Sequence, residues 1–189
     1  MALTPSTMLP LGTPAPDFSL PATDGSTVSL NGFKNNKLLV VAFICNHCPF
    51  VKHIRARLAQ VGNNYHAKGV GFIAINSNDI VAFPADNMEK MREEVTAVGY
   101  MFPYLLDEDQ SVAKAYDAAC TPDFYLFNAD RKLIYRGQFD GSRPGNDVAV
   151  TGQDLCAAIN AALQDKQIAD EQKPSIGCNI KWKPDNDPN

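Results

Sequence analysis

The chain has 189 residues, 45% hydrophobic and 20% charged, a balance typical of one globular domain with a substantial core. Its formal net charge of −4 and its lack of a basic stripe argue against nucleic acid as a partner. The first ten residues have no basic start and no long apolar stretch, and no apolar run reaches the length of a membrane span. The sequence therefore predicts a cytoplasmic protein without membrane association.

The chain divides into three parts by composition. Residues 1–13 are predicted to form a loose arm, residues 14–165 a single domain, and residues 166–189 a polar tail packed on that domain. Four apolar or sulfur-containing residues alternate within the tail, which predicts a short extended segment with one docked face: Ile176, Cys178, Ile180 and Trp182.

The domain begins with a pattern typical of two short strands around a turn at Asp24-Gly25. Residues 38–44 are almost all bulky and apolar, which indicates a strand covered on both faces. Apolar residues then recur at helical spacing from Phe50 to Tyr65, and the predicted helix ends at Lys68-Gly69. A second buried strand over residues 70–76 completes a βαβ unit.

The remaining elements are expected in a simple order. They are a loop over 77–86, a helix over 87–98, an extended piece over 103–106, a short helix over 109–116, a hairpin of 124–127 with 132–136, a loop over 137–150, and a helix over 151–164 capped by Thr151.

The first buried strand leads directly into Cys45-Asn46-His47-Cys48, and Pro49 follows. Proline is favoured at the first helical position, where its missing N–H is not needed. This places Cys48 at the N-cap, where the free N–H groups of the first turn stabilise a thiolate. Since Cys45 lies three residues away, the pair can close a disulfide, and the pattern indicates redox chemistry.

The order of elements resembles the thioredoxin fold. The opening Ala15-Pro16-Asp17-Phe18-Ser19-Leu20 is similar to the start of the redoxin branch, and three further segments resemble a peroxiredoxin-like group within it: the Cys-x-x-Cys turn, residues 120–124 and residues 177–182. The resemblance implies an α/β thioredoxin-like fold, with a central mixed β-sheet flanked by helices, an N-terminal β-hairpin extension and a docked C-terminal tail.

The same resemblance assigns a role to Thr121-Pro122. Pro122 matches the cis-proline of thioredoxins, and a cis bond there would place the Thr121 backbone beside the reactive sulfur, ready to bind an extended substrate. A trans proline that begins a strand is the alternative.

Two registers are open for the nucleophile. Simple matching to thioredoxin makes Cys45 the attacking thiol and Cys48 its resolving partner. Counting from the strand end at Phe43, and the position of Pro49 at the helix start, instead favour Cys48 as the thiolate and Cys45 as its partner.

Three functions fit this turn, and the first is favoured: a thiol–disulfide oxidoreductase with an antioxidant or redox role. The second is a thiol-dependent peroxidase. The Thr and Arg that polarise a peroxide in that branch would fall at Cys45 and near Pro122, so efficient turnover is not expected. The third is Cu(I) or Zn(II) binding by the same thiols, for which the chain offers no second Cys-x-x-Cys.

The implied partners are a protein or small-molecule disulfide or a hydroperoxide, together with a dithiol reductant such as a thioredoxin. No nucleotide, flavin or haem motif is present, so no cofactor is expected. Auxiliary roles are open for His47, Cys120 and Cys178. Packing is favoured over redox chemistry for both cysteines, and His47 either adds positive charge or is an exposed turn residue.

Overall fold

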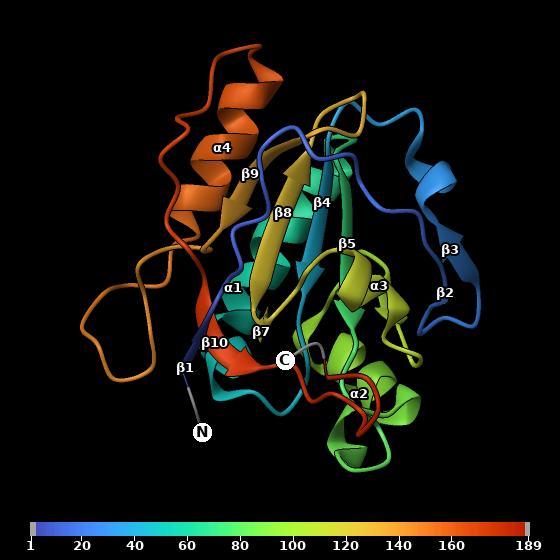
Figure 1. Cartoon of the computed structure of the whole chain (residues 1–189). Helices are drawn as coiled ribbons and strands as arrows, with labels where there is room; N and C mark the ends of the chain where they lie inside the picture. The colour runs from blue at the N-terminus through green and yellow to red at the C-terminus, as the bar shows by residue number, and fades with distance from the viewer. Residues whose placement is uncertain (1–2, 188–189) are drawn as a thin grey trace.

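A computed structural model describes residues 3–187, which are arranged around a sheet with the strand order β6-β5-β4-β8-β9 (Figure 1). Strands β4, β5 and β6 run parallel, whereas β8 and β9 are antiparallel to their neighbours. The sheet is therefore mixed, and the apolar strand that the sequence predicts lies at its centre. The bounds are β4 (Leu39–Phe43), β5 (Gly71–Asn76), β6 (Tyr104–Leu106), β8 (Asp123–Phe127) and β9 (Leu133–Gly137).

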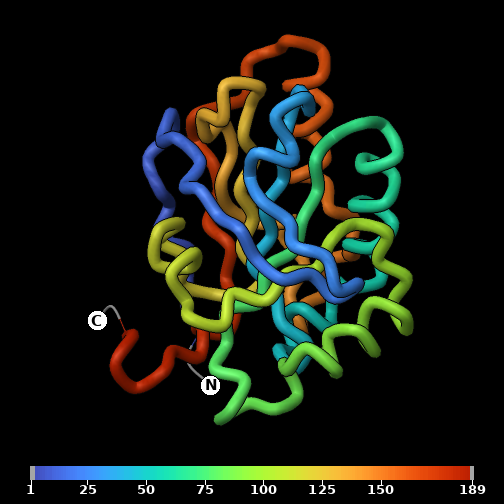
Figure 2. The backbone as a smooth tube through the Cα atoms, turned by 90° about the vertical axis from the view of Figure 1, so that its right-hand side faces the viewer, coloured from blue at the N-terminus to red at the C-terminus, as the bar shows by residue number. Residues whose placement is uncertain are grey.

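Helices cover both faces of this sheet. Helices α1 (Pro49–Ala67), α2 (Met88–Val98) and α4 (Gln153–Leu163) pack on one face, and α3 (Ser111–Ala115) packs on the other together with the N-terminal segment. Figure 2 shows the strands between these two layers. Two short 3₁₀ helices complete the helical content of the described chain, η1 (Leu30–Phe33) and η2 (Pro84–Asp86).

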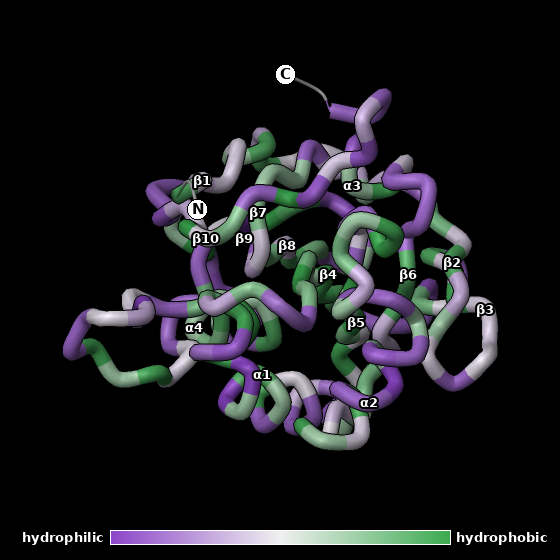
Figure 3. Tube along the Cα trace, turned by 90° about the horizontal axis from the view of Figure 1, so that it is seen from below, coloured by the Kyte–Doolittle hydropathy of each residue, from purple (hydrophilic) through white to green (hydrophobic). Residues whose placement is uncertain are grey.

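Strand β4 is fully buried because each of its faces contributes to a separate core. Val40 and Ala42 belong to the core beneath α1, whereas Leu39, Val41 and Phe43 belong to the core beneath the N-terminal segment and α3. Side chains alternate along a strand, so a strand with helices on both faces has to be apolar at every position. Seen from below, the hydrophobic strands β4, β5 and β8 lie at the centre (Figure 3).

The expected N-terminal hairpin is present as β2 (Ser19–Pro21) and β3 (Thr27–Ser29). Gly25 adopts a φ of 88° in the turn, a conformation that glycine reaches without steric cost. Asp24 Oδ1 accepts the backbone N–H of Ser26 at 2.9 Å, which closes the turn.

Most helix bounds agree with the sequence pattern, but the start of α4 does not. The N-cap of α4 is Gly152, with a φ of 69°, one residue after the expected cap Thr151, whose hydroxyl oxygen still accepts the N–H of Gln153 at 3.3 Å. The Asp140 carboxylate accepts the N–H groups of Thr151 and Gly152, at 2.7 and 2.5 Å. The Phe139 carbonyl oxygen accepts N–H groups of the first helical turn, so the helix start depends on the preceding loop and is not visible in the local sequence.

The chain ends form a second sheet that corrects one prediction. The sequence predicts a loose arm over residues 1–13, of which Met1 and Ala2 lie outside the described residues. The structure instead contains β1 (Leu3–Pro5), which pairs with β10 (Ile176–Asn179), and β10 pairs with β7 (Cys120–Thr121). Both pairings are antiparallel, so β10 lies between a strand from the chain start and a strand beside the cysteine turn (Figure 1).

The docked tail is confirmed in part. Cys178 and Ile180 are buried, and Trp182 packs partly buried against the core under α3. Ile176, the first of the four alternating residues, is instead 36% exposed. In the described part of the chain, no helix combines the length and the apolar composition that a membrane span requires.

Gly177 allows β10 to lie close against β7. A Cβ atom at position 177 would lie 2.0 Å from the Thr121 carbonyl oxygen, which is backbone and unable to rotate away. We therefore expect Gly177→Ala to separate β10 from β7, so that the amides of residues 176–179 exchange hydrogen faster while those of β4 and β5 do not change. Hydrogen–deuterium exchange measures both.

Gly141→Ala is the matched control, because a Cβ atom there meets only Val148 Cγ1, at 3.9 Å. Unchanged protection of residues 176–179 in Gly177→Ala would contradict this account of the tail.

Candidate active site

The turn between β4 and α1 carries both cysteines of the Cys-x-x-Cys pair. Cys48 is the N-cap residue of α1, with an extended backbone (φ −63°, ψ 124°), and Pro49 is the first helical residue. This is the helix start that the sequence predicts. The N-cap position puts the Cys48 side chain at the end of the helix where the N–H groups have no partner within the helix, and the N–H of Val51 lowers its pKa.

Both sulfur atoms lie against Thr121. Cys48 Sγ is 3.2 Å from the Thr121 carbonyl oxygen, and Cys45 Sγ is 3.4 Å from the Thr121 hydroxyl oxygen. The peptide bond between Thr121 and Pro122 is cis, as the resemblance to thioredoxins implies. Both cysteines are free thiols and almost fully buried, with exposed fractions of 1% for Cys45 and 0% for Cys48.

The two thiols differ in their ease of ionisation. A hydrogen bond from Cys45 lowers the pKa of Cys48, and contacts with Cys178 and the backbone N–H of Val51 lower it further, against the opposing effect of burial. The pKa of Cys45 is raised, first because it gives that hydrogen bond to Cys48, and then because of burial and the nearby Asp86 carboxylate. The electrostatics therefore favour a thiolate at Cys48 and a neutral thiol at Cys45.

A buried carboxylate holds the outer side of the turn. Asp86 Oδ1 accepts the backbone N–H groups of Asn46 and His47, at 2.8 and 3.2 Å, and Asp86 Oδ2 accepts the side-chain amide of Asn78 at 2.8 Å. Burial alone would raise the pKa of Asp86, but hydrogen bonds from His47 and Asn78 and the charge interaction with His47 outweigh it, so the pKa is lowered. Asp86 lies at the end of the loop predicted over 77–86, where the sequence gives no sign that a carboxylate turns inward.

His47 is tied to this carboxylate and is not an isolated, exposed turn residue. Its Nδ1 lies 2.5 Å from Asp86 Oδ2, and its ring stacks on Phe83 with 5.3 Å between ring centroids. The Asp86 carboxylate would therefore offset a positive charge on His47. The stabilisation that this charge could give to a thiolate at Cys48 would be weakened.

Three groups here have ligand atoms within 4.8 Å of one another: Cys45, His47 and Asp86. They supply three of the four ligands of a usual zinc site. However, Asp86 Oδ1 already accepts two backbone N–H groups, and Asp86 Oδ2 contacts His47 and Asn78. The donor set is therefore engaged in fixing the turn, and the geometry fits a positioning role better than metal coordination.

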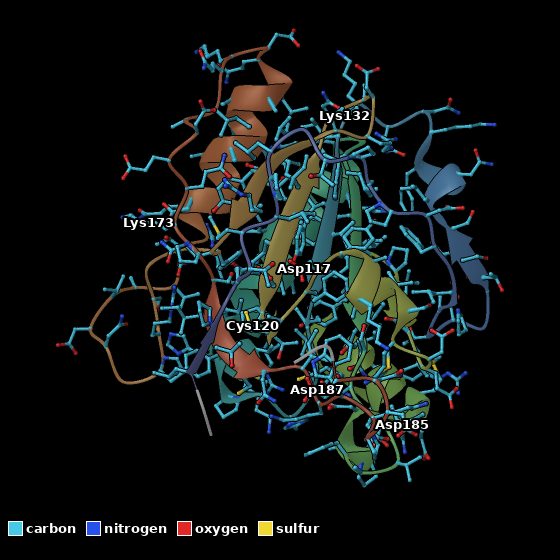
Figure 4. All side chains as sticks on the ribbon, in the orientation of Figure 1. Asp117, Cys120, Lys132, Lys173, Asp185 and Asp187 are labelled. Carbon is cyan, nitrogen blue, oxygen red and sulfur yellow. The ribbon has the colours of Figure 1, made fainter. Side chains whose placement is uncertain are left out.

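The structure brings Cys178 to the thiol pair and turns Cys120 away from it. Cys178 pairs with Thr121 in the sheet and lies in the same buried core cluster as Cys45 and Cys48. Cys120 Sγ instead approaches the carbonyl oxygen of Pro122, at 3.8 Å, and Figure 4 shows it beside the ribbon of β10. Cys120 is buried, which fits the packing role that the sequence analysis favours.

Two other residues occupy positions away from the thiols. Cys156 is partly buried on α4 at the edge of the core, as expected of a packing residue. His53 lies on α1 with Nε2 2.7 Å from the hydroxyl oxygen of Ser142.

Asp123 is a second buried carboxyl group that sequence reasoning missed. It follows Pro122 directly, and the hydroxyl group of Ser6 donates to its Oδ1 at 2.7 Å, while the hydroxyl group of Tyr125 donates to its Oδ2 at 3.1 Å. Ser6 Oγ also accepts the N–H of Ser175 at 2.9 Å. Asp123 therefore links the N-terminal arm and the tail to the strand that follows the site.

Comparison with known proteins places this arrangement in a family. Residues 10–155 match the Redoxin family, which is most of the chain. The chain belongs to the Redoxin family. Its thioredoxin-like fold and its resemblance to redoxins are thereby confirmed. As a redoxin with a Cys45/Cys48 pair, it is related to oxidoreductases of the thiol–disulfide type.

Two solved structures are similar to this redoxin over nearly its full length. A hypothetical protein of Sinorhizobium meliloti 1021 is 53% identical, with a TM-score of 0.94 and coverage of 96% of this chain and 99% of that one. An uncharacterized conserved protein of Geobacillus kaustophilus is also 53% identical, with a TM-score of 0.95 and coverage of 97% and 98%. Neither description includes an activity.

A third relative carries a functional description. The thiol-disulfide oxidoreductase ResA of Bacillus subtilis (strain 168) is 26% identical over 123 residues, which are 65% of this chain. The match spans 64% of the relative, slightly less than two thirds of its length.

The carboxyl group of Asp123 should make the stability of this redoxin depend on pH. Burial raises its pKa to about 7 in the folded protein, whereas the unfolded chain has the ordinary value of about 3.9. Between these values the folded protein binds a proton that the unfolded chain has lost, so the free energy of unfolding falls as pH rises from about 4 to about 7. Asp123→Asn cannot ionise, so we expect wild type to lose stability relative to this variant over that range.

Urea unfolding of both proteins at pH 5 and pH 8 measures this difference. Asp130→Asn, at an exposed position between β8 and β9, serves as the control. An equal gap between wild type and Asp123→Asn at the two pH values would show that Asp123 does not titrate in this range.

Proposed function

We propose that this redoxin is a thiol–disulfide oxidoreductase in which Cys48 attacks and Cys45 resolves. The observation that carries the proposal is the position of Cys48 at the N-cap of α1, where the neighbouring Cys45 thiol lowers its pKa. A thiolate is the nucleophile in thiol–disulfide exchange, and the helix start favours the ionised form at Cys48.

The chemistry takes two exchanges. The Cys48 thiolate attacks one sulfur of a substrate disulfide, which forms a mixed disulfide and releases the other substrate sulfur as a thiolate that takes up a proton. Cys45 then loses its proton and attacks Cys48 Sγ, which releases the second substrate thiol and leaves a Cys45–Cys48 disulfide. An external dithiol, such as a thioredoxin, returns the pair to the reduced state.

Thr121 is the proposed substrate contact for this reaction. Its carbonyl oxygen faces Cys48 Sγ and its hydroxyl group faces Cys45 Sγ, so the residue contacts both reacting atoms. Because Cys48 is 0% exposed, the segment that covers it has to move before a substrate disulfide can reach the sulfur. Candidate substrates are protein disulfides and small-molecule disulfides.

Peroxide reduction is the less favoured alternative. The position of the expected Thr is occupied by Cys45, and the expected Arg position falls near Pro122. Arg143, in the loop after β9, lines the same pocket as Pro122, and its guanidinium group donates to Gln138, Asp140 and Ser142. No arginine in the described chain is shown bonded to Cys48.

The assignment of the nucleophile predicts which variant traps substrate. Cys178 is replaced in both proteins because its thiol contacts Cys48. In the Cys178→Ala background we expect Cys45→Ser to accumulate a mixed disulfide at Cys48, since attack survives without resolution, and Cys48→Ser to lose disulfide reduction. Mass spectrometry after incubation with oxidised glutathione identifies the adduct and the cysteine that carries it.

An adduct on Cys45 of the Cys48→Ser protein, with none on Cys48 of the Cys45→Ser protein, would show that Cys45 attacks. The single variant Cys178→Ala is the control, and it should form the Cys45–Cys48 disulfide under mild oxidation.

Slow peroxide turnover is a separate expectation. Without the Thr and Arg that polarise a peroxide, the Cys48 thiolate has only its low pKa to promote the reaction, so we expect rates far below those of a true peroxidase. Stopped-flow measurement of thiol loss with hydrogen peroxide tests this. Rapid, saturating turnover with a thioredoxin as reductant would favour the peroxidase instead.

A further inference from the structure

Strand β10, near the end of the chain, pairs with the backbone of Thr121, where an extended substrate is expected to bind. Strand β10 lies antiparallel to β7, with Cys178 opposite Thr121 and Asn179 opposite Cys120. Side chains directly opposite each other in an antiparallel pair point to the same face of the sheet. Since the Thr121 side chain faces Cys45, the Cys178 side chain is directed to the same side, toward the thiol pair.

Cys178 and Cys48 lie close together. Both belong to the same buried core cluster, with exposed fractions of 2% and 0%, and each shifts the pKa of the other. Asn179 and Cys120 lie on the opposite face, because neighbouring residues of a strand alternate. Three thiols of the described chain therefore gather at one point: Cys45, Cys48 and Cys178.

The tail is held on both sides of Cys178. Before it, the backbone N–H of Ser6 donates to the Ser175 carbonyl oxygen at 2.9 Å. After it, the N–H of Ile180 donates to the Ala119 carbonyl oxygen at 3.0 Å, and the N–H of Lys181 donates to Asn78 Oδ1 at 2.9 Å. The absence of a side chain at Gly177 lets the strand reach this depth. Hydrogen bonds on both sides of Cys178 therefore fix its position.

We propose that Cys178 is a third redox cysteine, whose thiol acts as a built-in exchange partner for Cys48. This inference rests on the proposed function, because that function supplies the Cys45–Cys48 disulfide. The Cys178 sulfur attacks Cys48 Sγ, the Cys45–Cys48 bond breaks, a Cys48–Cys178 bond forms, and the proton of Cys178 passes to Cys45. One disulfide replaces another, so no oxidant or reductant is consumed.

The exchange creates no lasting charge in the buried site. Burial raises the pKa of Cys178 to about 12, and the pKa of Cys45 is also raised. One of these two residues is a neutral thiol before the exchange and the other is a neutral thiol after it. Burying a lone charge is costly, so the proton that leaves Cys178 as its sulfur attacks is taken up by Cys45 as that sulfur departs, and no thiolate remains in this interior.

The test uses the full chain with Cys45→Ser, treated with oxidised glutathione. Attack by Cys48 forms a mixed disulfide and releases glutathione, and Cys178 then displaces the second glutathione to form a Cys48–Cys178 disulfide. We expect peptide mapping to find this crosslink. The glutathione adduct at Cys48 should be roughly tenfold lower than in Cys45→Ser/Cys178→Ala, because the built-in thiol is already in place.

Cys45→Ser/Cys120→Ser is the matched control, and it should form the crosslink as Cys45→Ser does, since Cys120 faces the other side. Equal glutathione adducts in Cys45→Ser with and without Cys178, with Cys178 still open to alkylation after denaturation, would overturn the proposal. Diamide oxidation of Cys45→Ser provides a second route to the same crosslink if glutathione does not reach the site, and absence of the crosslink there would overturn it as well.

The two proposals fail in different ways. Formation of the Cys45–Cys48 disulfide in Cys178→Ala, without a Cys48–Cys178 crosslink in Cys45→Ser, would support the oxidoreductase and reject the third redox cysteine. A Cys48–Cys178 crosslink in Cys45→Ser, without any Cys45–Cys48 disulfide in Cys178→Ala, would reject the proposed resolving role of Cys45. It would still show that Cys178 lies within bonding reach of Cys48.

Discussion

The antiparallel pairing of Cys178 with Thr121 is the interaction on which the site depends. It covers the thiol pair, which is buried. It also brings the Thr121 backbone and the thiols of Cys45, Cys48 and Cys178 close together. The pairing itself depends on close approach, because any side chain larger than hydrogen at position 177 would collide with the Thr121 carbonyl group. Main-chain hydrogen bonds give such a strand addition its affinity, while side chains determine what it presents. Here the strand presents a cysteine.

Two buried carboxyl groups, Asp86 and Asp123, hold the segments around the site, and their pKa values are shifted in opposite directions. Asp86 receives four hydrogen-bonding contacts around the turn, and its pKa is lowered despite burial. Asp123 receives fewer, mainly from Ser6 and Tyr125, and burial dominates, so its pKa is raised. The first fixes the loop that carries the cysteines, and the second joins the chain ends to the strand behind them. At Asp86 the hydrogen bonds outweigh burial and favour the charged carboxylate, whereas at Asp123 burial outweighs the hydrogen bonds and favours the neutral acid.

Local sequence patterns were sufficient for the central strands, the helices and the start of α1. Continuous apolar runs, helical periodicity and the proline after Cys48 are all patterns of residues close together in the chain. The missed features come from contacts between distant residues. The pairing of Leu3–Pro5 with the tail, the hydrogen bonds of Asp140 to residues 151–152 and the inward turn of Asp86 each depend on a partner in another part of the chain. The resemblance to redoxins correctly implied the cis bond at Pro122, and local propensity alone favoured trans.

The order of the elements along the chain has a consequence for how the protein is made. Strand β10 comes after every strand of the central sheet, so on the ribosome the turn with Cys45 and Cys48 emerges long before the segment that covers it. Synthesis proceeds at about 5–20 residues per second, which leaves an interval of several seconds between the two. During that interval the nascent chain presents an uncovered cysteine pair to the thiols and disulfides of its surroundings. The mature site is shielded only once residues 176–179 have left the exit tunnel and paired with Thr121.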